Sequence, residues 1–115
     1  MTLRTSATEA KYQATKKSVR FMKDAPSLQE FREWRIINNE YPHDKIACTH
    51  HLLIPKRQVE RPIYLNEYEI AELDGLLEHV LPQTYDSIML NFPKRQSIKK
   101  WLHYHLYVYK VRNTW

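Results

Sequence analysis

Residues 101–111, WLHYHLYVYKV, have the pattern of a strand with one apolar face and one face that carries two histidines. This segment has no glycine or proline and is rich in aromatic and β-branched residues, which favours a β-strand. Successive side chains of a strand point to opposite faces. One face is therefore apolar and suits a core, with Leu102, Tyr104, Leu106 and Val108. The opposite face carries Trp101, His103, His105 and Tyr107.

The histidine pair on that second face is the first candidate site. Residues two apart on a strand have Cα atoms about 6.5–7 Å apart, so His103 and His105 can enter one site while the other face packs. Such a pair suits phosphoryl chemistry, with one imidazole as nucleophile and the other assisting with protons. The pair equally suits a metal site that has at least one further ligand. It also suits two ordinary residues on a solvated face.

The first half of the chain predicts one short helix and two strands. A capping box formed by Ser27 and Glu30 predicts a helix that ends near Trp34. Residues 35–40 and 46–57 predict two strands, antiparallel to each other. In the second strand His50 and His51 are adjacent, so they must point to opposite faces.

The second half predicts one long helix and one strand before the histidines. Asn66 and Glu69 form a second capping box, and an apolar stripe extends the helix to residue 81, ahead of Pro82. Residues 86–92 predict a strand. The order helix, strand, strand, helix, strand, strand predicts an α+β domain, an antiparallel β-sheet with helices on one face.

Composition narrows the classes of function. With 115 residues the chain is one domain, and its net charge of +5 favours anionic ligands. A single glycine argues against glycine-rich phosphate loops. Cys48 is the one cysteine, which excludes an internal disulfide, and it is expected to be a buried strand thiol. His43 in the turn after Pro42 is expected to be exposed.

The ends of the chain carry fewer signals. Residues 1–23 are polar and basic and predict an N-terminal arm, either a solvated terminus or an electrostatic contact for nucleic acid, ahead of a domain over residues 24–115. No apolar run reaches the length of a membrane span, and the N-terminus lacks a signal-peptide core, so an intracellular, cytoplasmic protein is expected.

Several short motifs occur in a recognisable order. WRIINNEYP at 34–42 precedes THHLLIPKR at 49–57, a helix follows, and Asn91 and Gln96-Ser97-Ile98 come before the histidines. In this order and spacing, residues 34–109 resemble the histidine-triad (HIT) superfamily of nucleotide hydrolases and transferases. The triad is incomplete. Trp101, His103 and His105 occupy its three positions in one register, and His103, His105 and Tyr107 occupy them in the other.

The resemblance implies a register and a nucleophile. The nucleophile of the family is the middle residue, which is His103 in the first register and His105 in the second. The first register needs only one extra residue after Gln96-Ser97, whereas the second needs three, so we prefer His103. His105 then assists the leaving group.

The resemblance also implies nucleotide-binding residues. They are Asn39, His50, Asn91, Gln96 and Ser97, with Asn39 near a ribose hydroxyl and His50 mainly structural. Asn39 at a strand end is equally ordinary turn chemistry. Gln96 and Ser97 lie in a basic loop that suits phosphate oxygens, although a basic surface hairpin has the same composition.

The function that follows is a HIT-like nucleotide hydrolase or nucleotidyl transferase. It would act at the α-phosphate through a nucleotidyl-histidine intermediate, without a cofactor or metal, and the resemblance suggests a homodimer. One alternative is a catalytically inactive module that binds nucleic acid or nucleotide through the basic arm and loop. The other is a metal site built from His103, His105 and a distant ligand.

Overall fold

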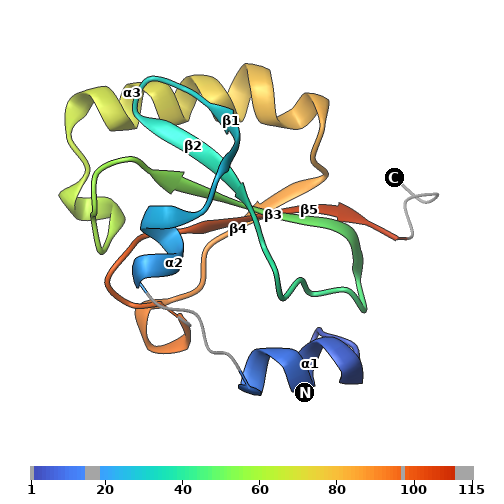
Figure 1. Ribbon diagram of the computed structural model, residues 1–115. Coiled ribbons are helices and arrows are strands. Elements are labelled where there is room, and N and C mark those ends of the chain that lie inside the picture. The colour runs from blue at the N-terminus through green and yellow to red at the C-terminus, as the bar shows by residue number, and fades with distance from the viewer. Residues whose placement is uncertain (1, 15–18, 97, 111–115) are drawn as a thin grey trace.

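The computed structural model describes residues 2–14, 19–96 and 98–110, and its centre is one antiparallel sheet (Figure 1). The sheet has five strands in the order β1-β2-β3-β5-β4. The strands are β1 (Ser27–Glu30), β2 (Trp34–Asn38), β3 (Ala47–Pro55), β4 (Ser87–Met89) and β5 (Tyr104–Tyr109). The predicted α+β fold with an antiparallel sheet is confirmed.

The helices lie on both sides of this sheet. They are α1 (Ser6–Ala14), α2 (Val19–Asp24) and α3 (Glu67–Gly75), and α3 continues as a π-helical segment (Leu76–Val80) and a 3-10 turn (Leu81–Gln83). Two further 3-10 turns are Pro62–Tyr64 and Pro93–Arg95. In Figure 1, α3 covers one face, as predicted, and the short helices α1 and α2 lie on the other. Within the described residues no helix has both the length and the apolar character to cross a membrane.

Each face of the sheet has its own apolar cluster. The cluster under α3 consists of Trp34, Ile36, Leu53, Leu73, Leu76, Leu81, Leu102 and Leu106. The cluster beside α2 consists of Met22, Ile37, Leu52, Ile54, Ile98 and Trp101. Both clusters use residues of β2 and β3, because these strands lie inside the sheet and alternate buried residues between its two faces.

The helix predicted to begin at Ser27 is wrong, because the segment forms strand β1. The Ser27 hydroxyl donates to Glu30 Oε1 at 3.0 Å, which is a contact between side chains and not the side-chain to main-chain contact of a capping box. Ser27 pairs with Ile37 of β2, and Leu28 is 54% exposed rather than part of a buried helix face. Sheet pairing therefore overrides the local capping pattern, as tertiary context commonly does with weak helix signals.

The capping box at Asn66 is confirmed. Asn66 Oδ1 accepts a hydrogen bond from the Glu69 amide at 2.9 Å, and the Asn66 amide donates to Glu69 Oε1 at 2.8 Å. Arg57, just after β3, donates to both carboxylate oxygens of Glu69, at 2.7 and 3.1 Å. The indole of Trp34 donates to the Glu69 carbonyl at 2.8 Å. One residue thus joins the start of α3 to β2 and β3.

The ionised form of Glu69 is favoured in the fold. Burial of the carboxyl opposes ionisation, but hydrogen bonds from Arg57 and the Asn66 amide, with the charge of Arg57, lower the pKa of Glu69 below 4.5. A carboxyl whose pKa is lowered by folding stabilises the fold above its unfolded pKa, and this contribution is lost as the pH falls through the lowered value.

We expect Glu69→Gln to reduce the free energy of unfolding at pH 7 by about 1–2 kcal/mol, a value discounted because Arg57 is half exposed. Glutamine keeps an acceptor for the Asn66 amide, so the loss reports the charge. In urea unfolding the difference from wild type should shrink toward pH 3. The control is Glu67→Gln, an exposed residue in the same helical turn. An equal loss at both pH values would contradict the assignment.

Candidate functional site

The pairing of β3 with β5 collects the histidines on the face away from α3. His50 is opposite Tyr107, and Leu52 is opposite His105. Directly opposite residues share a face, so His50, His105 and Tyr107 lie together. Leu102 and Leu106 pack in the cluster under α3. The predicted division of residues 101–107 between two faces is confirmed, although β5 begins only at Tyr104.

His103 precedes β5 and is held by the main chain. Its Nδ1 lies 2.9 Å from the carbonyl oxygen of Trp101. A carbonyl only accepts hydrogen bonds, so Nδ1 of neutral His103 carries the proton and Nε2 keeps its lone pair. The His103 and His105 rings are 5.3 Å apart, and His103 is only 2% exposed. Access of a ligand to Nε2 therefore requires that neighbouring side chains move.

His50 receives hydrogen bonds that define its tautomer. The His43 amide donates to His50 Nδ1 at 2.8 Å. The side chain of Asn39 lies on the same ring, with Nδ2 at 3.2 Å from Nδ1 and 3.3 Å from Nε2, while its Oδ1 accepts from the Tyr41 amide. Because Nδ1 accepts, the proton of neutral His50 is on Nε2.

The tautomer of His50 defines that of His105. His50 Nε2 is 2.8 Å from His105 Nδ1. Since His50 Nε2 is the donor, His105 Nδ1 accepts, and the proton of neutral His105 is on Nε2. His103 and His105 are thus opposite tautomers: Nε2 of His103 is unprotonated, and Nε2 of His105 carries the proton.

His43 belongs to the same cluster, which the sequence did not predict. It was expected to be exposed in a turn, and this is wrong: it is only partly exposed, and its Nδ1 lies 2.8 Å from the Tyr107 hydroxyl. Its ring is 4.5 Å from that of His50 and 5.5 Å from that of His105. No sequence spacing indicates this contact, since 64 residues separate His43 from Tyr107.

The cluster does not have the arrangement expected of a metal site. Nitrogen atoms of His43, His50 and His105 lie within 4.8 Å of one another, which is the spacing of a ligand set. A ligating imidazole, however, normally donates through its second nitrogen. His50 Nδ1 instead accepts a main-chain N–H, so its Nε2 holds a proton rather than a lone pair. The His43 amide, the His50 ring and the His105 ring instead form a chain of hydrogen bonds.

The other predicted site residues occupy different places. Asn39 is buried behind His50, and its role at a ribose stays a prediction. Gln96 is buried and its Nε2 donates to the Asn91 carbonyl at 3.1 Å, so these two residues lie together in the loop before the histidines. Ser97 lies outside the described residues. Cys48 is exposed, so its predicted burial is wrong.

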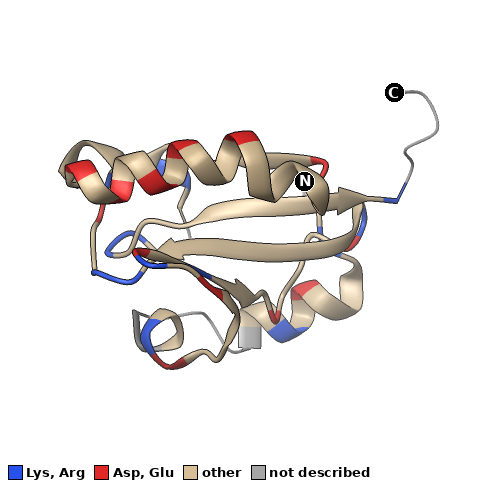
Figure 2. Ribbon diagram, turned by 90° about the horizontal axis from the view of Figure 1, so that it is seen from above, with Lys and Arg blue, Asp and Glu red and all other residues tan. Residues whose placement is uncertain are grey.

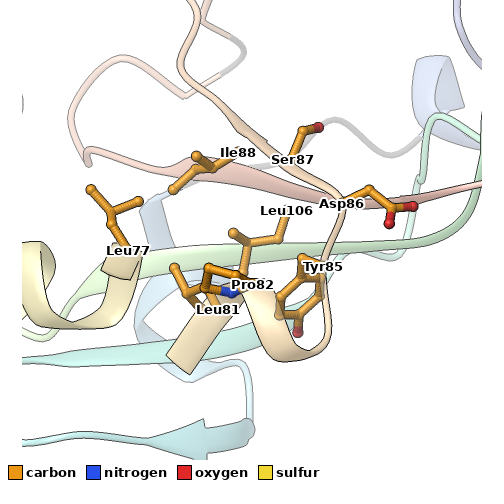
Figure 3. Close-up of a pocket in the computed structure, with 8 residues that line it drawn as sticks. All are labelled: Leu77, Leu81, Pro82, Tyr85, Asp86, Ser87, Ile88 and Leu106. Carbon is orange, nitrogen blue, oxygen red and sulfur yellow. The ribbon is translucent and has the colours of Figure 1, made fainter. Parts of the chain in front are cut away.

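A second tyrosine–histidine pair lies on the other face of the sheet. His51 points away from His50, as predicted, and its Nδ1 is 2.7 Å from the Tyr85 hydroxyl. Burial lowers the pKa of His51 and raises the pKa of Tyr85, which favours a neutral pair. Tyr85 also lines a small apolar pocket of about 150 Å³ between the end of the long helix and β4 (Figure 3). Since Leu106 lines this pocket, it is on the α3 side and separate from His103 and His105.

Comparison with known proteins gives matches only among solved structures. No protein-family model matches the chain, and no curated protein matches it either. A structure described as a HIT-like protein matches with a TM-score of 0.58 at 18% identity, over 76% of this chain and 89% of that one. A HIT family hydrolase from Legionella pneumophila Philadelphia 1 matches with a TM-score of 0.55 at 20% identity, over 84% of this chain and 90% of that one.

A hypothetical histidine triad nucleotide-binding protein from Sulfolobus tokodaii strain 7 also matches. Its TM-score is 0.58 at 21% identity, over 82% of this chain and 67% of that one. Identities this low establish a shared arrangement of strands and helices. The chain therefore has the fold of the histidine-triad (HIT) superfamily.

Proposed function

We propose that this protein is a HIT-like nucleotide hydrolase or nucleotidyl transferase that acts at the α-phosphate of a nucleoside phosphate derivative. The observation that carries the proposal is the 2.9 Å contact between His103 Nδ1 and the Trp101 carbonyl. It leaves Nε2 with the lone pair that a nucleophile needs. It also supports the register in which Trp101, His103 and His105 stand at the triad positions. HIT family hydrolases among the solved structures that share the fold add support.

In the first step His103 Nε2 attacks the α-phosphorus. A phosphorus–nitrogen bond forms and the bond from phosphorus to the leaving group breaks. The electron pair of that bond goes to the leaving group, which accepts a hydrogen bond from His105 Nε2–H and takes its proton from solvent. His103, now bonded at both nitrogens, is cationic, and the Trp101 carbonyl stabilises the charge through Nδ1–H.

In the second step water or another acceptor attacks the nucleotidyl-histidine. The proton of the acceptor passes to solvent, and His105 Nε2–H donates a hydrogen bond to a phosphate oxygen. The phosphorus–nitrogen bond breaks and its electron pair returns to His103 Nε2. Both histidines are then in their starting tautomers, and the cycle needs no redox reagent.

Charge separation supports a phosphate-bearing ligand. Acidic residues line α3, and basic residues occupy loops beside the sheet (Figure 2). The exposed basic residues of these loops are Lys56, Arg57, Arg61, Lys94, Arg95, Lys99 and Lys100. The Gln58 side chain donates to the Lys100 carbonyl at 3.2 Å, so two of the loops are adjacent, next to Trp101. A positive field there attracts anionic substrates and raises their local concentration.

The same basic loops favour a second candidate function. A module that binds nucleic acid without turnover would use these side chains for phosphate contacts, and its affinity would fall steeply with salt. The basic arm over residues 1–23 and the homodimer also stay predictions.

We expect intact-mass spectrometry to find an adduct of one nucleotide on His103 after brief incubation with an adenylate that carries an activated leaving group. The sample must stay free of acid, which cleaves phosphorus–nitrogen bonds. His103→Ala should lose both the adduct and turnover, by about three orders of magnitude or more. The control is His51→Gln, a histidine on the opposite face, which should react like wild type.

Two results would contradict this assignment. An adduct mapped to His105 would make that residue the nucleophile and support the second register. No adduct and no product across several nucleotides, together with salt-dependent binding of single strands, would favour the binding module.

We expect the double variant Lys99→Gln, Lys100→Gln to raise KM for the nucleotide about three- to tenfold at low salt, with kcat little changed. The two lysines attract the substrate through the field rather than through the reacting atoms. The difference should diminish at 200 mM salt because ions screen exposed charges. Lys110→Gln is the control, as an exposed lysine after the far end of β5. An equal rise in KM for the control would refute a local effect.

A further inference from the structure

We propose that His43 and Tyr107 form a positioning pair that fixes the tautomer of His105 by holding His50 in one orientation. The catalytic meaning of the pair rests on the proposed function, in which His105 Nε2–H donates a hydrogen bond to the leaving group. The tautomer itself can be measured without any substrate.

The first member of the pair is Tyr107, whose phenol is buried. The Tyr107 hydroxyl is 2.8 Å from His43 Nδ1, and Tyr107 is 2% exposed. Burial, reinforced by the neighbouring Tyr109, raises the pKa of Tyr107 far above its ordinary value of 10. The phenol therefore keeps its proton near neutral pH and is hydrogen-bonded to His43 Nδ1. This hydrogen bond holds the His43 ring against β5.

The main chain of His43 is the link to His50. Its amide donates to His50 Nδ1 at 2.8 Å, so the place of residue 43 decides whether that donor is present. The loop around it is anchored on both sides. Asn39 Oδ1 accepts from the Tyr41 amide, and Asp44 accepts from the Thr5 amide at 2.6 Å and from the Thr8 hydroxyl at 2.6 Å. Tyr107 holds the His43 side chain between these two fixed points, and His43 is the residue whose amide donates to His50.

The rings pack as one group. His43 lies nearly parallel to His105, at 15° and 5.5 Å, and Tyr107 lies nearly parallel to His105, at 10° and 6.2 Å. His43 and Tyr107 also contact His50, at 4.5 and 4.7 Å between ring centres. Movement of His43 would therefore loosen both partners of the His50–His105 hydrogen bond.

The orientation of His50 decides what His105 can donate. If the His43 amide leaves Nδ1, His50 can carry its proton there and accept with Nε2. His105 would then carry its proton on Nδ1 and present a bare Nε2 to the reacting group. In that state it can no longer donate a hydrogen bond to the leaving group. A hydrogen bond remote from the reacting atoms thus selects the active tautomer.

The pair between Tyr85 and His51 is a matched control. It also joins a tyrosine hydroxyl to a histidine Nδ1, at 2.7 Å, and both residues are partly buried. It lies on the opposite face of the sheet. Removing its hydroxyl tests the general effect of a lost tyrosine–histidine hydrogen bond.

The experiment compares Tyr107→Phe with Tyr85→Phe in full-length, ¹⁵N-labelled protein. Long-range ¹H–¹⁵N spectra distinguish protonated from bare imidazole nitrogens. In wild type and in Tyr85→Phe we expect His50 and His105 to be protonated at Nε2 and bare at Nδ1. In Tyr107→Phe we expect a second tautomer of both residues. The kcat for nucleotide turnover should fall about two- to tenfold, as for one lost hydrogen bond.

His43→Ala and the double variant test whether the two residues act as a unit. His43→Ala keeps the main-chain amide but removes the ring to which the Tyr107 hydroxyl is hydrogen-bonded. We expect its spectra to change as in Tyr107→Phe. The kcat of the double variant should be no more than about twofold below the kcat of the less active single variant. If the double variant instead lost kcat by the product of the two single losses, the two residues would act independently and the proposed pair would be refuted.

The remaining outcomes separate this inference from the proposed function. Unchanged His50 and His105 spectra in Tyr107→Phe would overturn the positioning role, whatever the activity. A tautomer shift in a protein whose wild type forms no nucleotide adduct would uphold the positioning role and refute the catalytic proposal.

Discussion

The antiparallel pairing of β3 with β5 is the constraint on which the site depends. It sets His50 opposite Tyr107 and Leu52 opposite His105, so that the imidazoles share the face away from α3. A slip of one residue would turn His50 and His105 toward opposite faces. The register is held by the apolar residues of both faces, since Leu53 and Leu106 pack under α3 while Leu52 packs beside α2.

Main-chain groups determine the tautomers of the histidines. A carbonyl can only accept a hydrogen bond and an amide can only donate, so each imposes one tautomer on the imidazole it contacts. The Trp101 carbonyl gives His103 a protonated Nδ1, and the His43 amide gives His50 a protonated Nε2. Two histidines two positions apart thereby acquire opposite roles.

Acidic and basic residues lie in different parts of the structure. The helix α3 is acidic, and its docking depends on Glu69, which joins the capping box to Arg57 and Trp34. The basic loops lie at the side of the sheet, near the start of β5. The acidic helix α3 thus covers one face of the sheet, and the basic loops lie near His103.

Local patterns in the sequence predicted much of this structure. The strand pattern over residues 101–107 indicated which side chains share a face, and the capping box at Asn66 indicated where α3 begins, because both depend only on neighbouring residues. The segment after Ser27 and the turn at His43 were predicted wrongly, since long-range pairing decides both: β1 forms because β2 is beside it, and His43 enters the cluster because Tyr107 binds it. The sequence alone therefore determined which residues could do chemistry, while the tertiary structure decided their tautomers, because a tautomer depends on the donor or acceptor that folding brings to each ring.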